Sequence, residues 1–307
     1  MQPGAGGYFQ YSLVGGAGTS GQVVVTNLSK APATYELYAA QATTAPTSGV
    51  AYGQPSSAGQ GDAPWVHLAV TQVELAPGAH QAVAFTVTVP PGTHPGQHVT
   101  AVVAASPEVS QAPASSAAGS SVALVVTSRV IVAIVVTVPG AAAAGVHVGR
   151  PRVEAQQHVR QEVLIPMANT GDLLVKPHLT GTIAPCNGAA GPQATIDRQL
   201  TTFVPHTAIA FPWYLSTALA AGCYRAALEL SARTPNGVAV TSRFTGDVWI
   251  NSAQVAITSP SATPRLPFTL PAPLAVADAA ALGLAVLGFG YVVLRRRTRE
   301  DRSSTTS

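Results

Sequence analysis

Strand-forming residues, regularly spaced turns and one long apolar segment predict an all-β protein of two tandem β-sandwich domains, a stalk and a C-terminal transmembrane helix. Val and Thr, which favour strands, are abundant, and 28 Gly and 25 Pro supply turns. Short apolar runs recur between Pro/Gly turns roughly every eight to twelve residues, which is typical of a sandwich. Residues 274–294 form an apolar run long enough to span a bilayer.

The first domain is expected at residues 1–140 and to be immunoglobulin-like (Ig-like). Residues 33–39 alternate between two faces, and residues 81–89 place Val83, Phe85 and Val87 on one face, which is the period of a strand. Pro/Gly turns separate these runs, and 45–63 is expected to be a long loop. Strands are predicted at 22–27, 33–39, 65–70, 81–89 and 97–105.

The end of the first domain is predicted from two contrasting segments. Residues 106–121 are rich in Ser, Ala and Pro, which indicates an exposed loop. Residues 122–138 are almost wholly apolar and β-branched but contain Arg129. We interpret them as two consecutive strands, the later of which closes the domain at Pro139-Gly140.

A second Ig-like sandwich is expected at residues 141–257. Asn169-Thr170-Gly171 predicts a turn, because Asn and Gly adopt positive φ easily. Asn236-Gly237 between two alternating runs is the strongest hairpin signal in the chain and should pair 222–230 with 238–244. Further strands are predicted at 159–167, 173–183, 203–215 and 247–250.

The C-terminal part predicts a membrane anchor. Residues 258–273 read as a Pro/Ser/Thr stalk, and 274–294 carry one charge, Asp278, over a helix of about 31 Å. Arg295, Arg296 and Arg297 begin a basic tail, 295–307, that should stay in the cytoplasm. The domains are therefore expected outside a cell membrane crossed once. Because no leader is evident at Met1, a removed leader, a late start or a fragment is expected.

The two cysteines, Cys186 and Cys223, are predicted to form a disulfide. An extracellular location favours oxidation, and no CxxC spacing supports a metal site. The bond closes a loop of about 38 residues, which the chain-entropy model values at about 3–4 kcal/mol.

Composition argues against catalysis and nucleic-acid binding. Only 9% of the residues are charged, the carboxylates are scattered, and no nucleophile elbow or phosphate-binding loop is present. Net charge is −3 over 1–125 and +4 over 126–265, without a basic stripe interleaved with aromatics. The sequence therefore predicts a non-enzymatic protein with no cofactor, no metal and no nucleic-acid partner.

Histidines and tryptophans leave alternatives open. Three histidines of the first domain brought together would bind Zn or Cu, but their spacing favours exposed loop positions; the relevant residues are His67, His80, His94 and His98. Trp249 is expected in the core and Trp65 at least partly buried. Trp213, after Pro212, is the best candidate for an exposed aromatic that contacts a glycan or a partner.

The order of two sandwiches, stalk and anchor resembles the WxL-interacting proteins of Gram-positive bacteria. That family is expected to carry an N-terminal peptidoglycan-binding Ig-like domain, a second Ig-like domain and a C-terminal span with a basic tail. The residues that carry the resemblance are Tyr8-Phe9, 23–29, Trp65-Val66, 75–78, 87–90, Pro95-Gly96, 135–140, 168–171 and 222–225.

The resemblance implies a membrane-anchored cell-surface protein that associates with the cell wall. Its partners would be peptidoglycan or another wall polymer, together with a secreted or surface protein. Free sheet edges would offer sites for strand addition. The alternative is a structural spacer or an assembly subunit of a membrane or secretion complex that does not bind glycan. A metal-handling surface domain is a third, weaker possibility.

Overall fold

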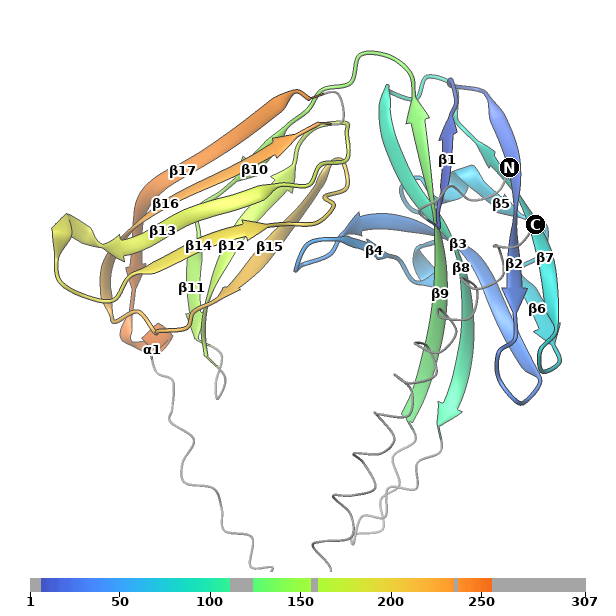
Figure 1. The fold of residues 1–307 in the computed structure, drawn as a ribbon, viewed down its shortest axis with the longest axis horizontal. Helices are drawn as coiled ribbons and strands as arrows, with labels where there is room; N and C mark the ends of the chain where they lie inside the picture. The colour runs from blue at the N-terminus through green and yellow to red at the C-terminus, as the bar shows by residue number, and fades with distance from the viewer. Residues whose placement is uncertain (1–6, 111–123, 156–159, 235–236, 256–307) are drawn as a thin grey trace, which may run out of the picture. The chain divides into compact units, whose positions relative to one another are not determined.

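A computed structural model describes residues 7–110, 124–155, 160–234 and 237–255, which form two β-sandwiches (Figure 1). The predicted all-β, Ig-like class is confirmed for these residues. The predicted stalk, span and tail, including Arg295, Arg296 and Arg297, lie outside the described residues. The domain boundaries predicted at 140/141 and 257/258 stay predictions.

The N-terminal sandwich packs two sheets face to face. The larger sheet has the order β1-β9-β8-β3-β4, with β6 beside β3, and the smaller has the order β2-β7-β5. The strands of the larger sheet are β1 (Phe9–Ser12), β9 (Leu124–Val138), β8 (Gly96–Ser110), β3 (Ala33–Thr44), β4 (Val50–Tyr52) and β6 (Gln72–Leu75). Those of the smaller sheet are β2 (Gly18–Thr26), β7 (His80–Thr88) and β5 (Val66–Leu68).

The core of this sandwich follows the alternation of its strands. Val83, Phe85 and Val87 of β7 are buried, whereas the residues between them are exposed. They pack with inward residues of the other sheet, such as Leu37 and Ile134. Burial of alternate apolar residues therefore fixes the register of each strand, because a shift of one residue would turn the apolar face outward.

Asn27 organises the turn between β2 and β3. Its side chain is fully buried at 0% exposure, and its Nδ2 donates to the carbonyls of Ala31 (2.8 Å) and Leu75 (2.9 Å). Its Oδ1 accepts from the Ser29 amide (2.9 Å) and the Tyr35 hydroxyl (3.2 Å). One side chain thus satisfies backbone groups that neither sheet reaches.

We expect Asn27→Ala to lower the free energy of unfolding by about 2–4 kcal/mol, because the buried Leu75 carbonyl and the part-buried Ala31 carbonyl lose their donor. Urea denaturation followed by fluorescence measures this loss. Gln60→Ala, at an exposed loop position, is the matched control and should change stability little. Equal stability of the two variants would contradict the role given to Asn27.

The C-terminal sandwich also pairs two sheets. One has the order β10-β12-β11, with β15 on the other side of β12, and the other has the order β14-β13-β16-β17. The strands of the first are β10 (Val146–Val148), β12 (Gln161–Asn169), β11 (Arg152–Ala155) and β15 (Thr207–Tyr214). Those of the second are β14 (Ala194–Gln199), β13 (His178–Pro185), β16 (Gly222–Arg233) and β17 (Ala239–Ile250), which leads into the short helix α1 (Ser252–Val255).

The predicted hairpin between β16 and β17 is confirmed. The two strands pair from Gly222 opposite Ile250 to Arg233 opposite Ala239. Gly237 has φ +84°, a left-handed conformation that suits glycine, and the Thr234 amide donates to the Val238 carbonyl at 2.9 Å. The sequence therefore predicted the hairpin that pairs these two strands.

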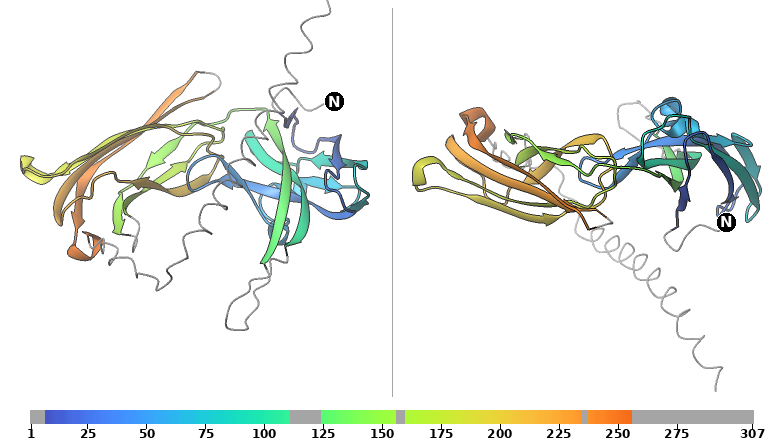
Figure 2. Two further views of the ribbon diagram at one scale, coloured as in Figure 1. Left: turned by 60° about the horizontal axis from the view of Figure 1, so that its bottom comes forward. Right: turned by 90° about the horizontal axis from the view of Figure 1, so that it is seen from above.

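Several segments differ from the predictions, among them three in the N-terminal sandwich. Residues 106–110 continue β8 instead of starting a loop, 122–138 contain one strand instead of two, and the loop 45–63 contains β4. Strands β8 and β9 pair without interruption from Gly96 opposite Val138 to Ser110 opposite Leu124. They run side by side as the longest arrows of Figure 2.

Arg129 does not break β9 because its charge is accommodated outside the core. Its Nη1 donates to the Tyr38 hydroxyl (3.3 Å) and the Gly53 carbonyl (3.2 Å). A charged side chain in a strand marks a break only when it has no such partners.

Candidate functional site

The most distinctive feature of the N-terminal sandwich is the outer edge of β9. On one side β9 pairs with β8 along its whole length, but on the other side β1 pairs only with Ile134–Thr137. No described strand pairs with this outer edge over residues 124–133. Backbone N–H and C=O groups of alternate residues there are available to an additional strand.

A groove of about 1070 Å³ runs beside this edge, between β9 and β2. Its lining contains no charged residue and includes Val23, Val25, Leu37, Val102, Ala104 and Val132. Val130 of β9 is 68% exposed at its margin, and Leu28 in the turn after β2 is 89% exposed. Apolar side chains of this kind at a sheet edge are typical of interaction surfaces.

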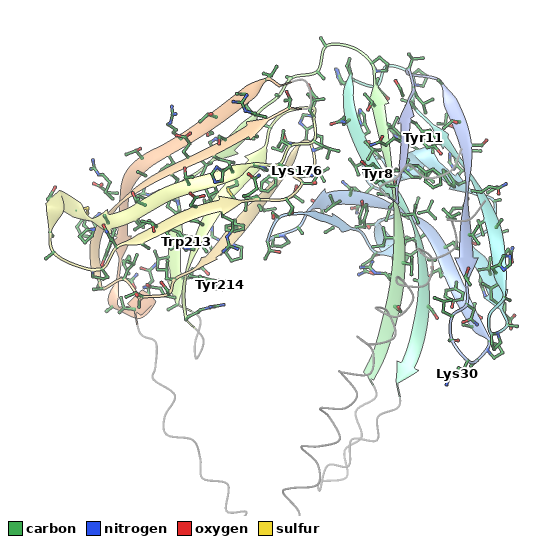
Figure 3. The ribbon with its side chains drawn as sticks, in the orientation of Figure 1. Tyr8, Tyr11, Lys30, Lys176, Trp213 and Tyr214 are labelled. Carbon is green, nitrogen blue, oxygen red and sulfur yellow. A yellow bond between two sulfur atoms is a disulfide. The ribbon has the colours of Figure 1, made fainter. Side chains whose placement is uncertain are left out.

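The opening between the two sheets along the outer edge of β9 is called the seam below. Strand β1 closes the seam at its other end. Phe9 lies opposite Ile134 and Tyr11 opposite Val136, and the Phe9 ring packs edge-on against Phe85 at 5.1 Å between centroids. Figure 3 shows Tyr11 on β1, Tyr8 just before this strand, and Lys30 in the turn that follows β2. Phe9 is 3% exposed and Tyr11 packs against the core, so β1 fills the part of the seam that it covers.

Gly21 of β2 makes room for this packing. A Cβ at position 21 would lie 2.5 Å from Cζ of Phe85 and 2.9 Å from the Tyr11 hydroxyl. That hydroxyl is buried and has no hydrogen-bond partner among the described residues. Burial raises the pKa of Tyr11.

A second cavity, of about 610 Å³, lies on the other face of β9. It is lined by residues of both sandwiches, among them Tyr8, Tyr52, Val135, Lys176 and Arg233. The lining has two cationic side chains and no acidic one, so it favours an anionic group. Burial raises the pKa of Tyr52 in its wall.

His98 of β8 lies beside an acidic side chain, Asp62, in the N-terminal sandwich. Its Nδ1 lies 3.3 Å from Oδ2 of Asp62, its Nε2 lies 3.2 Å from the His94 carbonyl, and its ring lies 4.6 Å from that of Trp65. The ring donates to both acceptors at once only when both of its nitrogens carry a proton. Burial lowers the pKa of His98, but the hydrogen bond and charge of Asp62 outweigh burial and raise it overall.

We expect the pair to stabilise the fold in acid and not in base. Because the folded-state pKa lies above the ordinary 6.5, the contribution is fully present below pH 6.5 and is lost as pH rises through the raised pKa. Asp62→Asn should therefore cost more stability at about pH 5.5 than at about pH 8.5. Histidine NMR titration should show the His98 pKa falling in this variant; an unchanged value would contradict the pairing.

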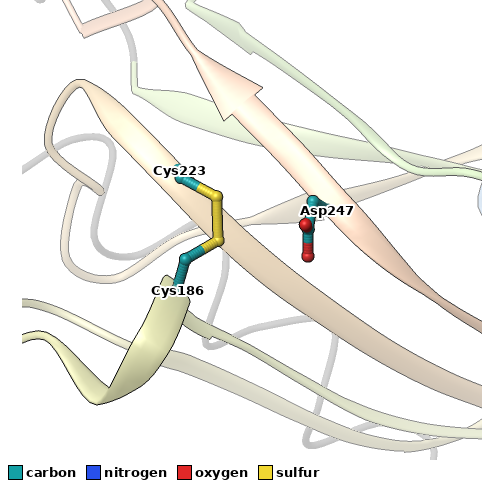
Figure 4. A group of neighbouring side chains, drawn as sticks. All are labelled: Cys186, Cys223 and Asp247. Carbon is teal, nitrogen blue, oxygen red and sulfur yellow. A yellow bond between two sulfur atoms is a disulfide. The ribbon is translucent and has the colours of Figure 1, made fainter.

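The predicted disulfide between Cys186 and Cys223 is present, with a Cα–Cα distance of 5.4 Å (Figure 4). Asp247 lies close enough to complete a group of three potential metal ligands, and no other such group occurs among the described residues. Sulfur atoms bonded to each other are not thiolate ligands, and Asp247 pairs with Arg225 at 2.8 Å. The group is therefore structural.

Removal of the disulfide, by Cys186→Ser with Cys223→Ser, should lower the free energy of unfolding by about 3–4 kcal/mol, the loop-closure value for this separation. Chemical denaturation with and without reductant measures the loss. Reductant should destabilise the native protein and leave the double variant unchanged; an equal response of both would contradict the bond.

Trp65 is buried at 8% exposure, as predicted, whereas Trp249 does not lie where the sequence placed it. Trp213 is only half-buried, against the core of the C-terminal sandwich, and its neighbour Tyr214 is 41% exposed with Arg160 4.3 Å above its ring. Trp249, expected in the core, is 70% exposed. It points outward because Val248 and Ile250 on either side of it occupy the inward positions of β17.

The histidine cluster required for a metal-handling domain is not assembled in the described part of the chain, where His98 faces Asp62. Sequence reasoning also missed the groove beside β9. The available signal was the length of the apolar run 122–138. A strand of that length is longer than a short neighbouring strand such as β1 covers, so part of its edge stays open.

Comparison with known proteins identifies no family: no protein-family model and no curated protein matches the sequence. Similar solved structures include a chaperone in a complex titled as a chaperone–tip adhesin complex of CFA/I fimbriae. That match has 12% identity, a TM-score of 0.34, and covers 76% of this chain and 95% of that one. The CupB2 chaperone of Pseudomonas aeruginosa matches at 8% identity and TM-score 0.31, covering 80% and 97%.

The periplasmic chaperone SfaE matches at 8% identity and TM-score 0.30, and covers 80% of this chain and 98% of that one. At such identities the likeness concerns the fold alone. No protein-family model matches the sequence, and the predicted membership of the WxL-interacting family is wrong.

The same finding corrects the predicted role, partners and location. The predicted attachment to the cell wall, with peptidoglycan or another wall polymer as partner, is contradicted. The predicted location, in a single-pass protein of the cell membrane with extracellular domains, is contradicted as well. Within the described residues, none of the helices has the length and hydropathy of a membrane span.

Proposed function

We propose that this protein is a non-enzymatic binding protein that holds an extended segment of a partner protein by strand addition to the free edge of β9. This function is nearest to the assembly-subunit alternative given by the sequence. The observation that carries it is the 15-residue strand β9, whose outer edge β1 covers only at Ile134–Thr137.

The edge is suited to strand addition in both backbone and side chains. Strand β8 supports β9 along its whole length, so an incoming segment meets a preformed template. Val130 and Ile131 are exposed at 68% and 36% on opposite faces of β9. A segment paired there gains backbone hydrogen bonds and covers apolar surface on both faces.

The charged residues of the C-terminal sandwich support a binding protein over an enzyme. On the outer face of its second sheet, Arg243 pairs with Glu229 at 2.8 Å, and Arg225 with Asp247 at 2.8 Å. These groups neutralise one another on an exposed surface instead of converging in a cavity, as general acid–base catalysis requires.

Backbone hydrogen bonds alone give modest affinity. Each contributes about 0.5–1.5 kcal/mol net, whereas association costs about 4 kcal/mol or more in lost freedom. Four to six such bonds roughly balance that cost, and burial of each valine or isoleucine adds about 1.5–3 kcal/mol. Apolar contacts at the edge therefore decide whether a segment stays bound.

The proposal is tested with a nine-residue peptide in which valine alternates with threonine. We expect the peptide to slow hydrogen–deuterium exchange in the 124–133 segment of β9, because its amides gain partners. Val130→Lys should weaken binding at least tenfold in fluorescence anisotropy, because it places a charge on the apolar edge. Val14→Lys, at a site 60% exposed outside the groove, is the matched control and should bind normally.

Exchange in 124–133 that stays unchanged at saturating peptide would overturn the proposed function. Equal weakening by Val14→Lys and Val130→Lys would do the same, since it would show a general effect of added charge and no site at β9. Analytical ultracentrifugation of the chain without peptide measures its oligomeric state. A dimer would show that a second copy of this protein occupies the edge.

A further inference from the structure

We propose that the groove between β9 and β2 is an acceptor for side chains, which selects partner segments with an aliphatic residue at every second position. The inference rests on the proposed function and adds the sequence pattern of the partner. It starts from the part of the seam that this chain fills with its own strand.

Strand β1 shows how a strand on this edge directs its side chains. Phe9 and Tyr11, two residues apart, lie opposite Ile134 and Val136 of β9 and point into the sandwich. Because side chains alternate along a strand, the face of β9 that carries Ile134 continues at every second residue toward its N-terminal end.

Those next positions line the groove. They are Val132, Val130 and Ser128, all of which belong to its lining, whereas Ala133 and Val135 of the other face line the second cavity. A segment paired with this stretch therefore directs every second side chain into the groove. These side chains lie opposite Val132, Val130 and Ser128. The intervening side chains lie on the outer face of the sheet.

The chemistry of the groove defines which side chains fit. Its lining is made of Val, Leu, Ala, Pro, Thr, Ser and one Tyr, with no charged group to pair with an incoming charge. A carboxylate or ammonium placed there loses its hydration without compensation. Small aliphatic side chains fit between the β-branched walls, and in the covered stretch of the seam the larger apolar ring of Phe9 takes the same place.

Two peptides of identical composition test the selection on the full chain. In one, valine alternates with threonine; in the other, the valines and the threonines form two separate blocks. We expect the alternating peptide to bind at least tenfold more tightly in fluorescence anisotropy. A third peptide, with aspartate in place of the valines, should not bind.

Ala104→Phe, which fills the groove from β8 without altering the edge of β9, should reduce the preference between the two peptides to less than twofold. Ser128→Phe tests the same point from β9 if the first variant does not fold. Ala227→Phe, at an exposed position of β16, is the matched control and should keep the preference.

The two proposals fail differently. If both peptides slow exchange in 124–133 and bind equally to the unmodified chain, strand addition stands and the groove does not select. If Ala104→Phe and Ser128→Phe keep the full preference, the selection does not arise in the groove and the inference is likewise overturned. If no peptide slows exchange at β9, both the proposed function and this inference are wrong.

Discussion

The backbone ladder between β8 and β9 is the interaction on which the rest of the N-terminal sandwich depends. It joins fifteen residue pairs, from Gly96 opposite Val138 to Ser110 opposite Leu124, and places β9 at the margin of the sheet. The inward side chains of both strands, such as Val102 and Ile134, form part of the core. The ladder therefore holds β9 in the sheet even over 124–133, where no described strand pairs with its other side.

Buried asparagines secure the ends of strands in both sandwiches. Asn27 follows β2, and Asn169 ends β12, where its Nδ2 donates to the carbonyls of Leu173 (2.8 Å) and Phe203 (3.1 Å). Its exposure is 1%. An amide both donates and accepts, so it replaces backbone partners that a tight turn leaves unmatched. The two sandwiches thus use the same means to connect their layers.

Local patterns in the sequence predicted the local structure well. Alternation in 81–89, the pairing of β16 with β17 and the pairing of Cys186 with Cys223 each depend on neighbouring residues or on the only possible partner. Arg129 and Trp249 were misplaced because their environments depend on distant residues. Tyr38 and Gly53 accommodate Arg129, and the inward positions of Val248 and Ile250 expose Trp249.

The length of the apolar run 122–138 was a signal for a long strand, but it did not locate the groove beside that strand, for the same reason. An apolar run shows that a strand is buried or covered, but not which part of its edge lacks a neighbour. That depends on the length of β1, four residues, against the fifteen of β9. The membrane anchor and the wall-binding family, by contrast, came from composition and order of segments, which many unrelated surface proteins share.

An open strand edge carries a hazard as well as an opportunity. The same exposed valine and unpaired amides that receive a foreign segment are equally suited to a second copy of the molecule, and edge-to-edge pairing propagates into fibrous aggregates. Occupancy by a partner removes that risk. The unoccupied protein is therefore most prone to aggregate in concentrated solution. A bound segment covers the edge and keeps the protein soluble.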